Sequence, residues 1–163
     1  MTPTTNGVAR RGHLLSISVQ RALRGDNRRL APRRERIMRW ARAAVQALDA
    51  EVVFRLVEAD EGQALNRDFR GKDYATNVLT FAYGAMSDAA GAALTGDIVL
   101  CVPVIRREAE AQGKALEAHF AHMVVHGMLH LQGFDHEVPA EAEEMESLET
   151  TIMAKLGYDD PYA

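Results

Sequence analysis

The hydrophobic pattern of the chain predicts an α+β fold, in which about five helices pack on a small four-stranded mixed sheet. Short segments of alternating or β-branched apolar residues indicate strands, and longer segments with apolar residues three or four positions apart indicate helices. The two kinds of segment occur in mixed order, and no linker rich in Pro, Gly or Ser divides them. We therefore expect residues 1–12 to form a flexible tail and residues 13–163 to form a single domain.

The first half of the chain contains four predicted elements and one polar turn. The clearest pattern lies in a helix whose Ile37, Trp40 and Ala44 fall on one face. The expected order is a strand at residues 14–19, this helix at residues 32–50, a strand at residues 52–57, a short helix at residues 61–69 and the polar turn at residues 70–73.

The second half ends in three predicted helices. Two strands come first, at residues 77–83 and 97–102, and the Gly- and Ala-rich residues 84–95 are expected to form the loop between them. Gly133 and Gly157 end the last two helices, since glycine readily takes the left-handed conformation that follows a helix. The three helices are expected at residues 103–112, 116–132 and 140–156.

Composition narrows the class of protein. Hydrophobic residues make up 47% of the chain and charged residues 26%, which excludes a disordered chain. Cys101 is the only cysteine, so an intrachain disulfide is excluded and we expect a reducing, cytoplasmic location. No apolar run approaches the roughly 18 residues of a membrane-spanning helix, so we expect no membrane partner.

The net charge of −4 hides a strong asymmetry. Residues 1–50 carry 11 Arg and 3 acidic residues, a net charge of +8, whereas residues 51–163 have a net charge of −12. The Glu-rich residues 137–149 contribute to the acidic part, and we predict that they form the solvated start of the last helix.

Three histidines have the spacing of a metal-binding site. His126 and His130 lie one helical turn apart, so both imidazoles project from the same side of the predicted helix. Gly133 then allows the chain to turn, and His136 can supply a third nitrogen, which is the spacing of the long zinc signature. Three neutral nitrogens without a fourth protein ligand describe an open, catalytic site. Zn²⁺, one ion per chain, is the expected metal, and Ni²⁺ is an alternative that imidazole also suits.

The residues around this motif leave alternatives open. Gly127 stands where zinc metalloproteases have the Glu that acts as general base, and either space for a substrate or close helix packing explains a glycine there. His119 and His122 extend the same helical stripe, and His122 is a candidate for orienting the ligands. Asp135 is a second candidate, although an aspartate in a turn more often satisfies backbone amides. For any single histidine, a hydrogen-bonded core residue is the simpler explanation.

Several segments resemble the YbeY endoribonuclease family. The most specific is residues 121–136, Ala-His-Met-Val-Val-His-Gly-Met-Leu-His-Leu-Gln-Gly-Phe-Asp-His. The resemblance covers about Glu51 to Tyr162, and the N-terminal tail and the Arg-rich segment match nothing in it. It also rests on residues 65–73, 76–81, 96–98, 144–146 and 156–162.

The resemblance implies a zincin-like fold and a single-strand-specific, metal-dependent endoribonuclease, which is a hydrolase of RNA phosphodiester bonds. It implies a role in the 3′-end maturation of small-subunit (16S) ribosomal RNA and in ribosome quality control. The implied partners are single-stranded RNA, ribosomal RNA and the small ribosomal subunit, and we expect a monomer. The metal ligands fall on His126, His130 and His136, and the functional arginine of the family falls on Arg70.

In this hypothesis the metal polarises a water or a phosphoryl oxygen, and Arg70 stabilises the charge on the scissile phosphate. A planar guanidinium suits this role, because it binds two phosphate oxygens and stays charged. A surface pairing with Asp68 or Asp73 is the alternative for Arg70. The general base is not assigned. Candidates for RNA binding are Lys72, Arg33 and Arg34. A solvated lysine in a turn is the alternative for Lys72, and a solvated helix face is the alternative for the two arginines.

Two other functions compete with this one. The metal spacing also suits a metzincin-like zinc peptidase, although Gly127 removes the usual proton carrier. A non-catalytic ribosome-assembly factor with a structural metal is the second alternative, and its fold would depend on the metal.

Overall fold

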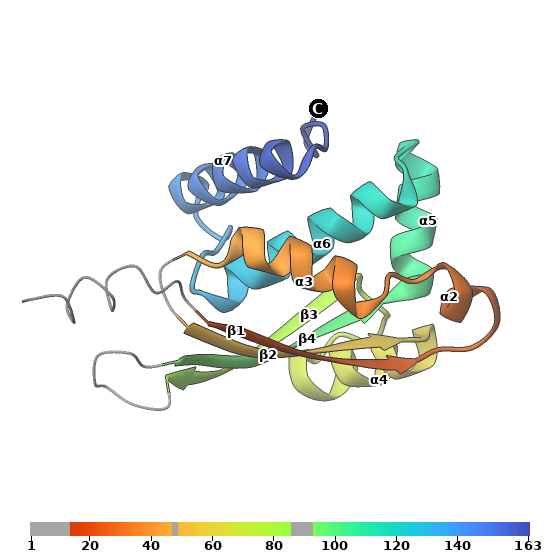
Figure 1. Ribbon diagram of the computed structural model, residues 1–163. Coiled ribbons are helices and arrows are strands. Elements are labelled where there is room, and N and C mark those ends of the chain that lie inside the picture. The colour runs from red at the N-terminus through yellow and green to blue at the C-terminus, as the bar shows by residue number, and fades with distance from the viewer. Residues whose placement is uncertain (1–13, 47–48, 86–92) are drawn as a thin grey trace, which may run out of the picture.

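The computed structural model describes residues 14–46, 49–85 and 93–163. The predicted tail at residues 1–12 and most of the predicted loop at residues 84–95 lie outside the described residues. The elements in chain order (Figure 1) are β1 (Leu15–Ala22), α2 (Gly25–Leu30), α3 (Arg34–Ala44), β2 (Asp49–Val57), α4 (Ala59–Arg70), β3 (Val78–Ala85), β4 (Ala93–Cys101), α5 (Val102–Gln112), α6 (Leu116–Leu131) and α7 (Pro139–Leu156).

The four strands form one mixed sheet. Their order is β1-β2-β4-β3, with β1, β2 and β4 parallel and β3 antiparallel to β4. The predicted α+β fold with a four-stranded mixed sheet is therefore confirmed. The described residues contain six helices rather than about five, because the Arg-rich segment includes the short helix α2. None of the residues of α2 is buried, so its sequence has no apolar periodicity that predicts it.

Two element boundaries differ most from the prediction. The helix expected at residues 32–50 ends at Ala44. Ala50, the last residue of the predicted helix, instead pairs with Leu15 in the sheet. β4 begins earlier than predicted, at Ala93, because the start of β2 gives it a neighbouring strand along its whole length. Strand pairing overrides the local sequence pattern in both places.

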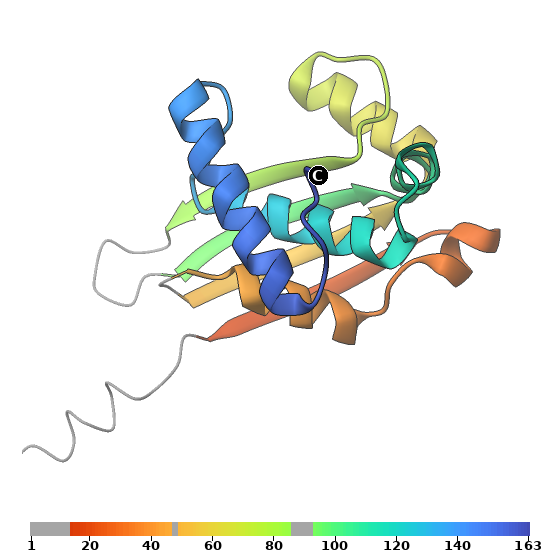
Figure 2. The ribbon, with the colours of Figure 1, turned by 90° about the horizontal axis from the view of Figure 1, so that it is seen from above.

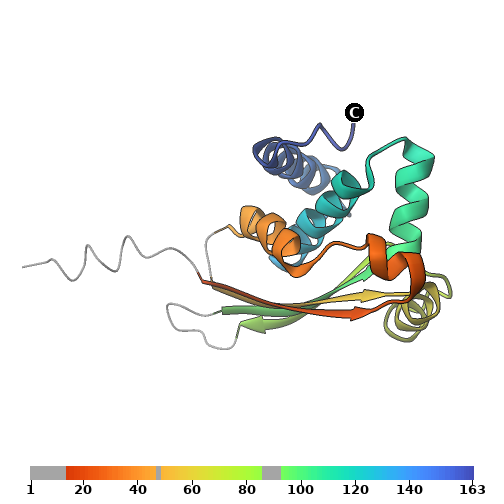
Figure 3. The same cartoon turned by 45° about the vertical axis from the view of Figure 1, so that its right-hand side comes forward.

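The helices cover the two faces of the sheet unequally. α3 and α6 pack on one face, α7 lies over both of them, and α4 lies on the opposite face (Figures 1 and 3). The main core lies between the sheet and the layer of α3 and α6, where Trp40, Phe54, Ile98, Met128 and Leu129 are fully buried. A smaller core beneath α4 includes the ends of β2, β3 and β4.

α6 is the central helix of the covered face. Viewed from above, α7 crosses it, and the C-terminal segment (residues 157–163) then runs back across it (Figure 2). One side of α6 therefore faces the sheet, and the other faces α7 and the C-terminal segment. No helix within the described ranges is both long and apolar enough to cross a membrane.

Two glycines allow α6 to lie close to the sheet. A Cβ atom on Gly127 would lie 3.1 Å from Ile98 Cγ2 and 3.4 Å from Val78 Cγ2, so this glycine serves close packing. A Cβ atom on Gly96 of β4 would lie 2.5 Å from Leu131 Cδ1 and 2.8 Å from the Phe81 carbonyl oxygen. The short distance between α6 and the sheet thus depends on glycine at one position of α6 and one position of β4.

We expect Gly96→Ala to lower the free energy of unfolding by about 1–3 kcal/mol, because its methyl group overpacks this contact. Leu131 can move, but the Phe81 carbonyl belongs to the neighbouring strand and cannot move without disturbing the sheet. Urea titration followed by circular dichroism measures the change. Ser18→Ala, at an exposed position of β1, is the control and should stay within about 0.5 kcal/mol of the wild type. Equal stability of the two variants contradicts the prediction.

Candidate metal centre

Four histidines line the side of α6 that faces away from the sheet. They are spaced three or four residues apart, so their rings follow one another along one stripe of the helix. Successive ring centroids lie 6.2 to 6.3 Å apart. The stripe runs from two buried rings to two half-buried rings at the C-terminal end of α6, in the order His119, His122, His126 and His130.

His136 returns to this stripe from the loop after α6. Gly133 has a φ of 103°, a left-handed conformation that allows the chain to reverse, and Phe134 N donates a hydrogen bond to the Leu129 carbonyl. The His136 ring centroid lies 5.6 Å from that of His126 and 6.0 Å from that of His130. The structure thus brings the three histidines that the sequence singled out into one cluster at the surface.

Hydrogen bonds fix the rings of two of these histidines. His126 Nδ1 lies 3.1 Å from Glu149 Oε1, and His130 Nδ1 lies 2.9 Å from the Phe134 carbonyl oxygen. Both partners are acceptors, so Nδ1 carries the proton and Nε2 keeps its lone pair. Histidines that bind metals usually have this second hydrogen bond, which sets the tautomer and the ring orientation. The residues present therefore fit a divalent metal held by imidazole nitrogens.

Glu149 of α7 is the functional residue that the sequence prediction missed. Its side chain is fully buried, so its assignment to a solvated helix start was wrong. Oε1 accepts from His126 Nδ1, while Oε2 accepts from His122 Nε2 and, at 2.8 Å, from the Tyr162 hydroxyl. The available signal was its place on the apolar stripe of α7, because Met145 and Ile152 lie four residues before and three residues after it.

Burial and hydrogen bonding have opposite effects on the pKa of the Glu149 carboxylate. Burial alone raises the pKa of Glu149, but the hydrogen bonds from His122 and His126 outweigh it and lower the pKa to about 2. Burial and the neighbouring carboxylate raise the pKa of Tyr162. Glu149 is therefore ionised near neutral pH, and Tyr162 stays protonated and donates to it.

A second set of donor atoms overlaps with the first. One nitrogen each of His122 and His126 and a carboxylate oxygen of Glu149 lie within 4.8 Å of one another, a spacing that a metal ion can also use. These atoms already pair with each other through hydrogen bonds, and Glu149 is fully buried. Glu149 and His122 are thus occupied with each other, whereas His126 and His130 are half-buried and His136 is exposed.

The other residues near the motif have structural partners. His119 Nε2 pairs with Glu108 at 2.9 Å, and burial lowers the pKa of His119. Asp135 Oδ1 accepts a hydrogen bond from the backbone N–H of His136 at 2.7 Å, which supports the turn that carries this histidine. Asp135 thus acts on the backbone of His136 rather than on its ring.

Arg70 lies at the C-terminal end of α4, next to the edge strand β3. Its exposed side chain approaches the carbonyl oxygen of Thr80 in the edge strand β3 at 3.4 Å. The two aspartates proposed as alternative partners bind elsewhere, because Asp68 pairs with Arg67 and Asp73 accepts from Gln63. Arg70 is thus available at the surface.

Gly71 places the residues that follow Arg70. It ends α4 with a φ of 71°, and Lys72 N donates to the Asn66 carbonyl. The buried Asn66 side chain also donates to the Tyr74 carbonyl at 2.8 Å. The turn that carries Arg70 and Lys72 is thus anchored from inside, while the Lys72 side chain is exposed.

The basic first third of the chain makes many contacts of its own. Arg34 Nε donates to the Ile17 carbonyl at 3.2 Å, whereas Arg33 is exposed at the start of α3. Arg36 pairs with Glu117 of α6, and Arg39 donates to the Leu156 carbonyl. Part of the Arg-rich segment therefore binds the acidic part of the chain.

Three imidazoles clustered at the surface of an α+β domain fit the open type of metal site that is found in enzymes. The comparisons with known proteins identify the family. A family model described as endoribonuclease YbeY matches residues 20–157, and the chain belongs to this family. The resemblance noted in the sequence is thus confirmed, and it begins earlier than Glu51, because the match includes α2 and α3.

Two curated relatives carry the same name. Endoribonuclease YbeY of Aromatoleum aromaticum is 61% identical over 149 residues, which cover 91% of this chain and 93% of the relative. Endoribonuclease YbeY of an Azoarcus species is 59% identical over 96% of this chain, which corresponds to 63% of that longer relative. A Thermotoga maritima protein of known solution structure is 25% identical, with a TM-score of 0.50 over 88% of this chain and 92% of the other.

We expect Glu149→Gln to lower the free energy of unfolding by about 2 kcal/mol near neutral pH, because an amide offers one acceptor oxygen where three donors converge. The pKa of Glu149 in the folded protein, about 2, lies below the ordinary value of 4.5. The carboxylate therefore stabilises the fold above pH 4.5, and this contribution is lost as the pH falls towards 2.

The difference in the free energy of unfolding between wild type and Glu149→Gln should accordingly become smaller as the pH falls from about 5 to about 3. Urea titrations at several pH values measure it. Glu146→Gln, at an exposed position of the same helix, is the control and should match the wild type throughout. A difference that does not change with pH contradicts the assignment.

Proposed function

We propose that this chain is a metal-dependent endoribonuclease that cleaves single-stranded RNA, with the metal held by His126, His130 and His136. The observation that carries the proposal is the cluster itself, in which three imidazole rings lie together and hydrogen bonds at Nδ1 of two of them leave Nε2 to bind a metal. The name shared by the relatives supports RNA as the substrate. We further propose the 3′ end of 16S ribosomal RNA, in the cytoplasm, as the place of action, and a single-domain monomer as the working form.

The donor set suits a phosphodiester substrate. Three neutral imidazoles add no negative charge, so the site stays electropositive towards an anionic substrate when Zn²⁺ or, as the alternative, Ni²⁺ is bound. The bound ion supplies Lewis-acid chemistry at the scissile phosphate. The role of the chain is to hold the three rings in place, and Glu149 does so for His126 through a buried hydrogen bond.

Arg70 is the proposed catalytic arginine. Its guanidinium is exposed and approaches a backbone carbonyl rather than a carboxylate, so its charge is available to a phosphate. Lys72 follows on the same anchored turn and adds a second cation for the RNA backbone. Arg33 and Arg34 are proposed as auxiliary contacts, with Arg33 the more accessible because Arg34 already binds the Ile17 carbonyl.

The two rival functions receive less support. A zinc peptidase of the usual kind needs Glu in place of Gly127, and this position packs against Ile98 and Val78 with no room for a longer side chain. A structural metal is expected where a fold lacks its own core. Here the core forms between the sheet and α6 without the clustered imidazoles, since His136 is exposed and His126 and His130 are only half-buried.

The experiment that tests the proposal combines metal analysis with cleavage assays. We expect about one zinc ion per chain, and cleavage of a single-stranded oligonucleotide from the 3′ end of 16S ribosomal RNA but not of its duplex or of casein. Chelation should abolish cleavage while the circular dichroism spectrum stays folded, and added zinc should restore it. His130→Ala should be inactive. Casein cleavage points to the peptidase, and unfolding on chelation points to the structural metal.

We expect Arg70→Ala to lower kcat for RNA cleavage by about 10²- to 10³-fold, because it removes a positive group that stabilises the transition state. Its zinc content should equal that of the wild type, since the side chain of Arg70 contacts the Thr80 carbonyl and not the histidine cluster. Arg67→Ala, an exposed arginine of the same helix that pairs with Asp68, is the matched control and should cleave at nearly the wild-type rate. Equal rates for both variants refute the role of Arg70.

A further inference from the structure

We propose that Tyr162 is a positioning residue of the metal centre, and that it acts by holding the Glu149 carboxylate in the orientation that fixes His126. The inference rests on the proposed function in one respect, the assignment of His126 as a metal ligand. It adds a role for the C-terminal segment that follows α7.

The contacts of Tyr162 point inward although its side chain lies at the surface. Its hydroxyl donates to Glu149 Oε2 at 2.8 Å, and its ring meets that of His122 edge to face at a centroid distance of 5.3 Å. The residue as a whole is 47% exposed, so burial of its ring does not account for this placement. The hydroxyl is the end of the side chain that contacts the fully buried Glu149.

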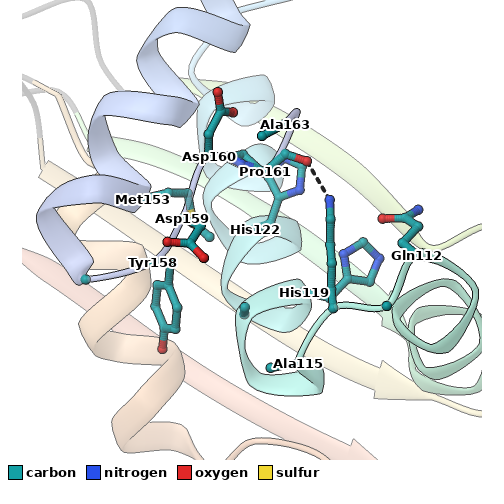
Figure 4. A pocket seen from close by; sticks show the side chains of 14 residues that line it. Gln112, Ala115, His119, His122, Met153, Tyr158, Asp159, Asp160, Pro161 and Ala163 are labelled. Atoms are coloured by element: carbon teal, nitrogen blue, oxygen red, sulfur yellow. Dashed lines mark hydrogen bonds between the residues drawn. The ribbon is translucent and has the colours of Figure 1, made fainter.

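The rest of the C-terminal segment is anchored so that Tyr162 reaches this position. Lys114, two residues before α6, donates through Nζ to the carbonyl oxygen of the buried Pro161. Asp160 Oδ1 accepts from the Tyr162 backbone N–H at 2.8 Å and from the Thr150 hydroxyl at 3.4 Å. Figure 4 shows His119 and His122 among the residues that line a pocket of about 480 Å³ beside this segment.

Geometry gives the hydroxyl a specific effect on the metal centre. The two oxygens of Glu149 serve different partners, because Oε1 faces His126 and Oε2 faces His122 and Tyr162. Two donors on Oε2 prevent the carboxylate from rotating about its Cγ–Cδ bond, so Oε1 stays aligned with His126 Nδ1. Loss of one donor lets the carboxylate turn, and the tautomer and ring orientation of His126 are then less well fixed.

Tyr158 provides a matched control within the same segment. It is a half-buried tyrosine four residues earlier, and the described residues offer its hydroxyl no hydrogen-bond partner. Removing the oxygen from either tyrosine is the same chemical change, so a difference between Tyr162→Phe and Tyr158→Phe reports the contact with Glu149 alone.

The test measures the zinc affinity of the full-length protein by competition with a chromophoric chelator, without RNA. We expect Tyr162→Phe to bind zinc about 10-fold more weakly than the wild type, the lower end of the effect of such supporting residues, and Tyr158→Phe to bind it equally well. The visible absorption of the cobalt-substituted protein, which reports ligand geometry, should change in Tyr162→Phe only. The unfolding temperature of each metal-free protein accompanies the titration.

Unchanged zinc affinity in Tyr162→Phe overturns the inference, as does an equal loss in both variants or a loss matched by unfolding of the metal-free protein. This outcome is separate from a failure of the proposed function. Wild-type protein that binds zinc but does not cleave RNA refutes the function and leaves the role of Tyr162 standing. Wild-type protein that cleaves RNA, with Tyr162→Phe at full zinc affinity, refutes only the role of Tyr162.

Discussion

The buried carboxylate of Glu149 is the group on which the arrangement of the site depends. It joins α7 to two histidines of α6 and to the C-terminal segment, so three separate parts of the chain meet at its two oxygens. An ionised carboxylate without partners is very costly to bury, and its three donors offset that cost. The packing of α7 on α6 and the orientation of the His126 ring therefore depend on each other, because α7 cannot move relative to α6 without disturbing His126.

The two sides of α6 serve different purposes. One side of the helix lies so close to the sheet that Gly127 and Gly96 leave no room for a Cβ atom without displacement. The other side carries histidines, and those at its N-terminal end are buried and hydrogen-bonded to glutamates of other helices. Only towards the C-terminal end do the rings reach the surface, and there His136 joins them. The rigid contact with the sheet thus supports an open cluster at one end of the helix.

The sequence predicts the local features of the site better than the features that depend on long-range packing. The meeting of His126 with His130 follows from helical periodicity alone, and the return of His136 follows from Gly133, so this cluster was predictable. Glu149 was not, because its role depends on how α7 crosses α6, which no local pattern records. The surrounding glutamates made the whole stretch look solvated, and only its position on the apolar stripe of α7 distinguished it. In the same way, pairing with neighbouring strands decided where β2 and β4 begin.

The charge asymmetry of the sequence also takes on a different meaning in the folded chain. Arg21 donates to the backbone carbonyls of Ala31 and Pro32, and Arg36 pairs with Glu117, so part of the positive charge of the first third serves the fold. An arginine that satisfies buried or partly buried acceptors cannot at the same time bind a phosphate with its full set of donors. A cationic side chain is better able to bind a nucleic acid when backbone contacts fix the position of its residue and its charged group is not used for internal hydrogen bonds. The turn after α4 has this property, since Gly71 and the buried Asn66 fix its backbone and leave the charged ends of its side chains at the surface.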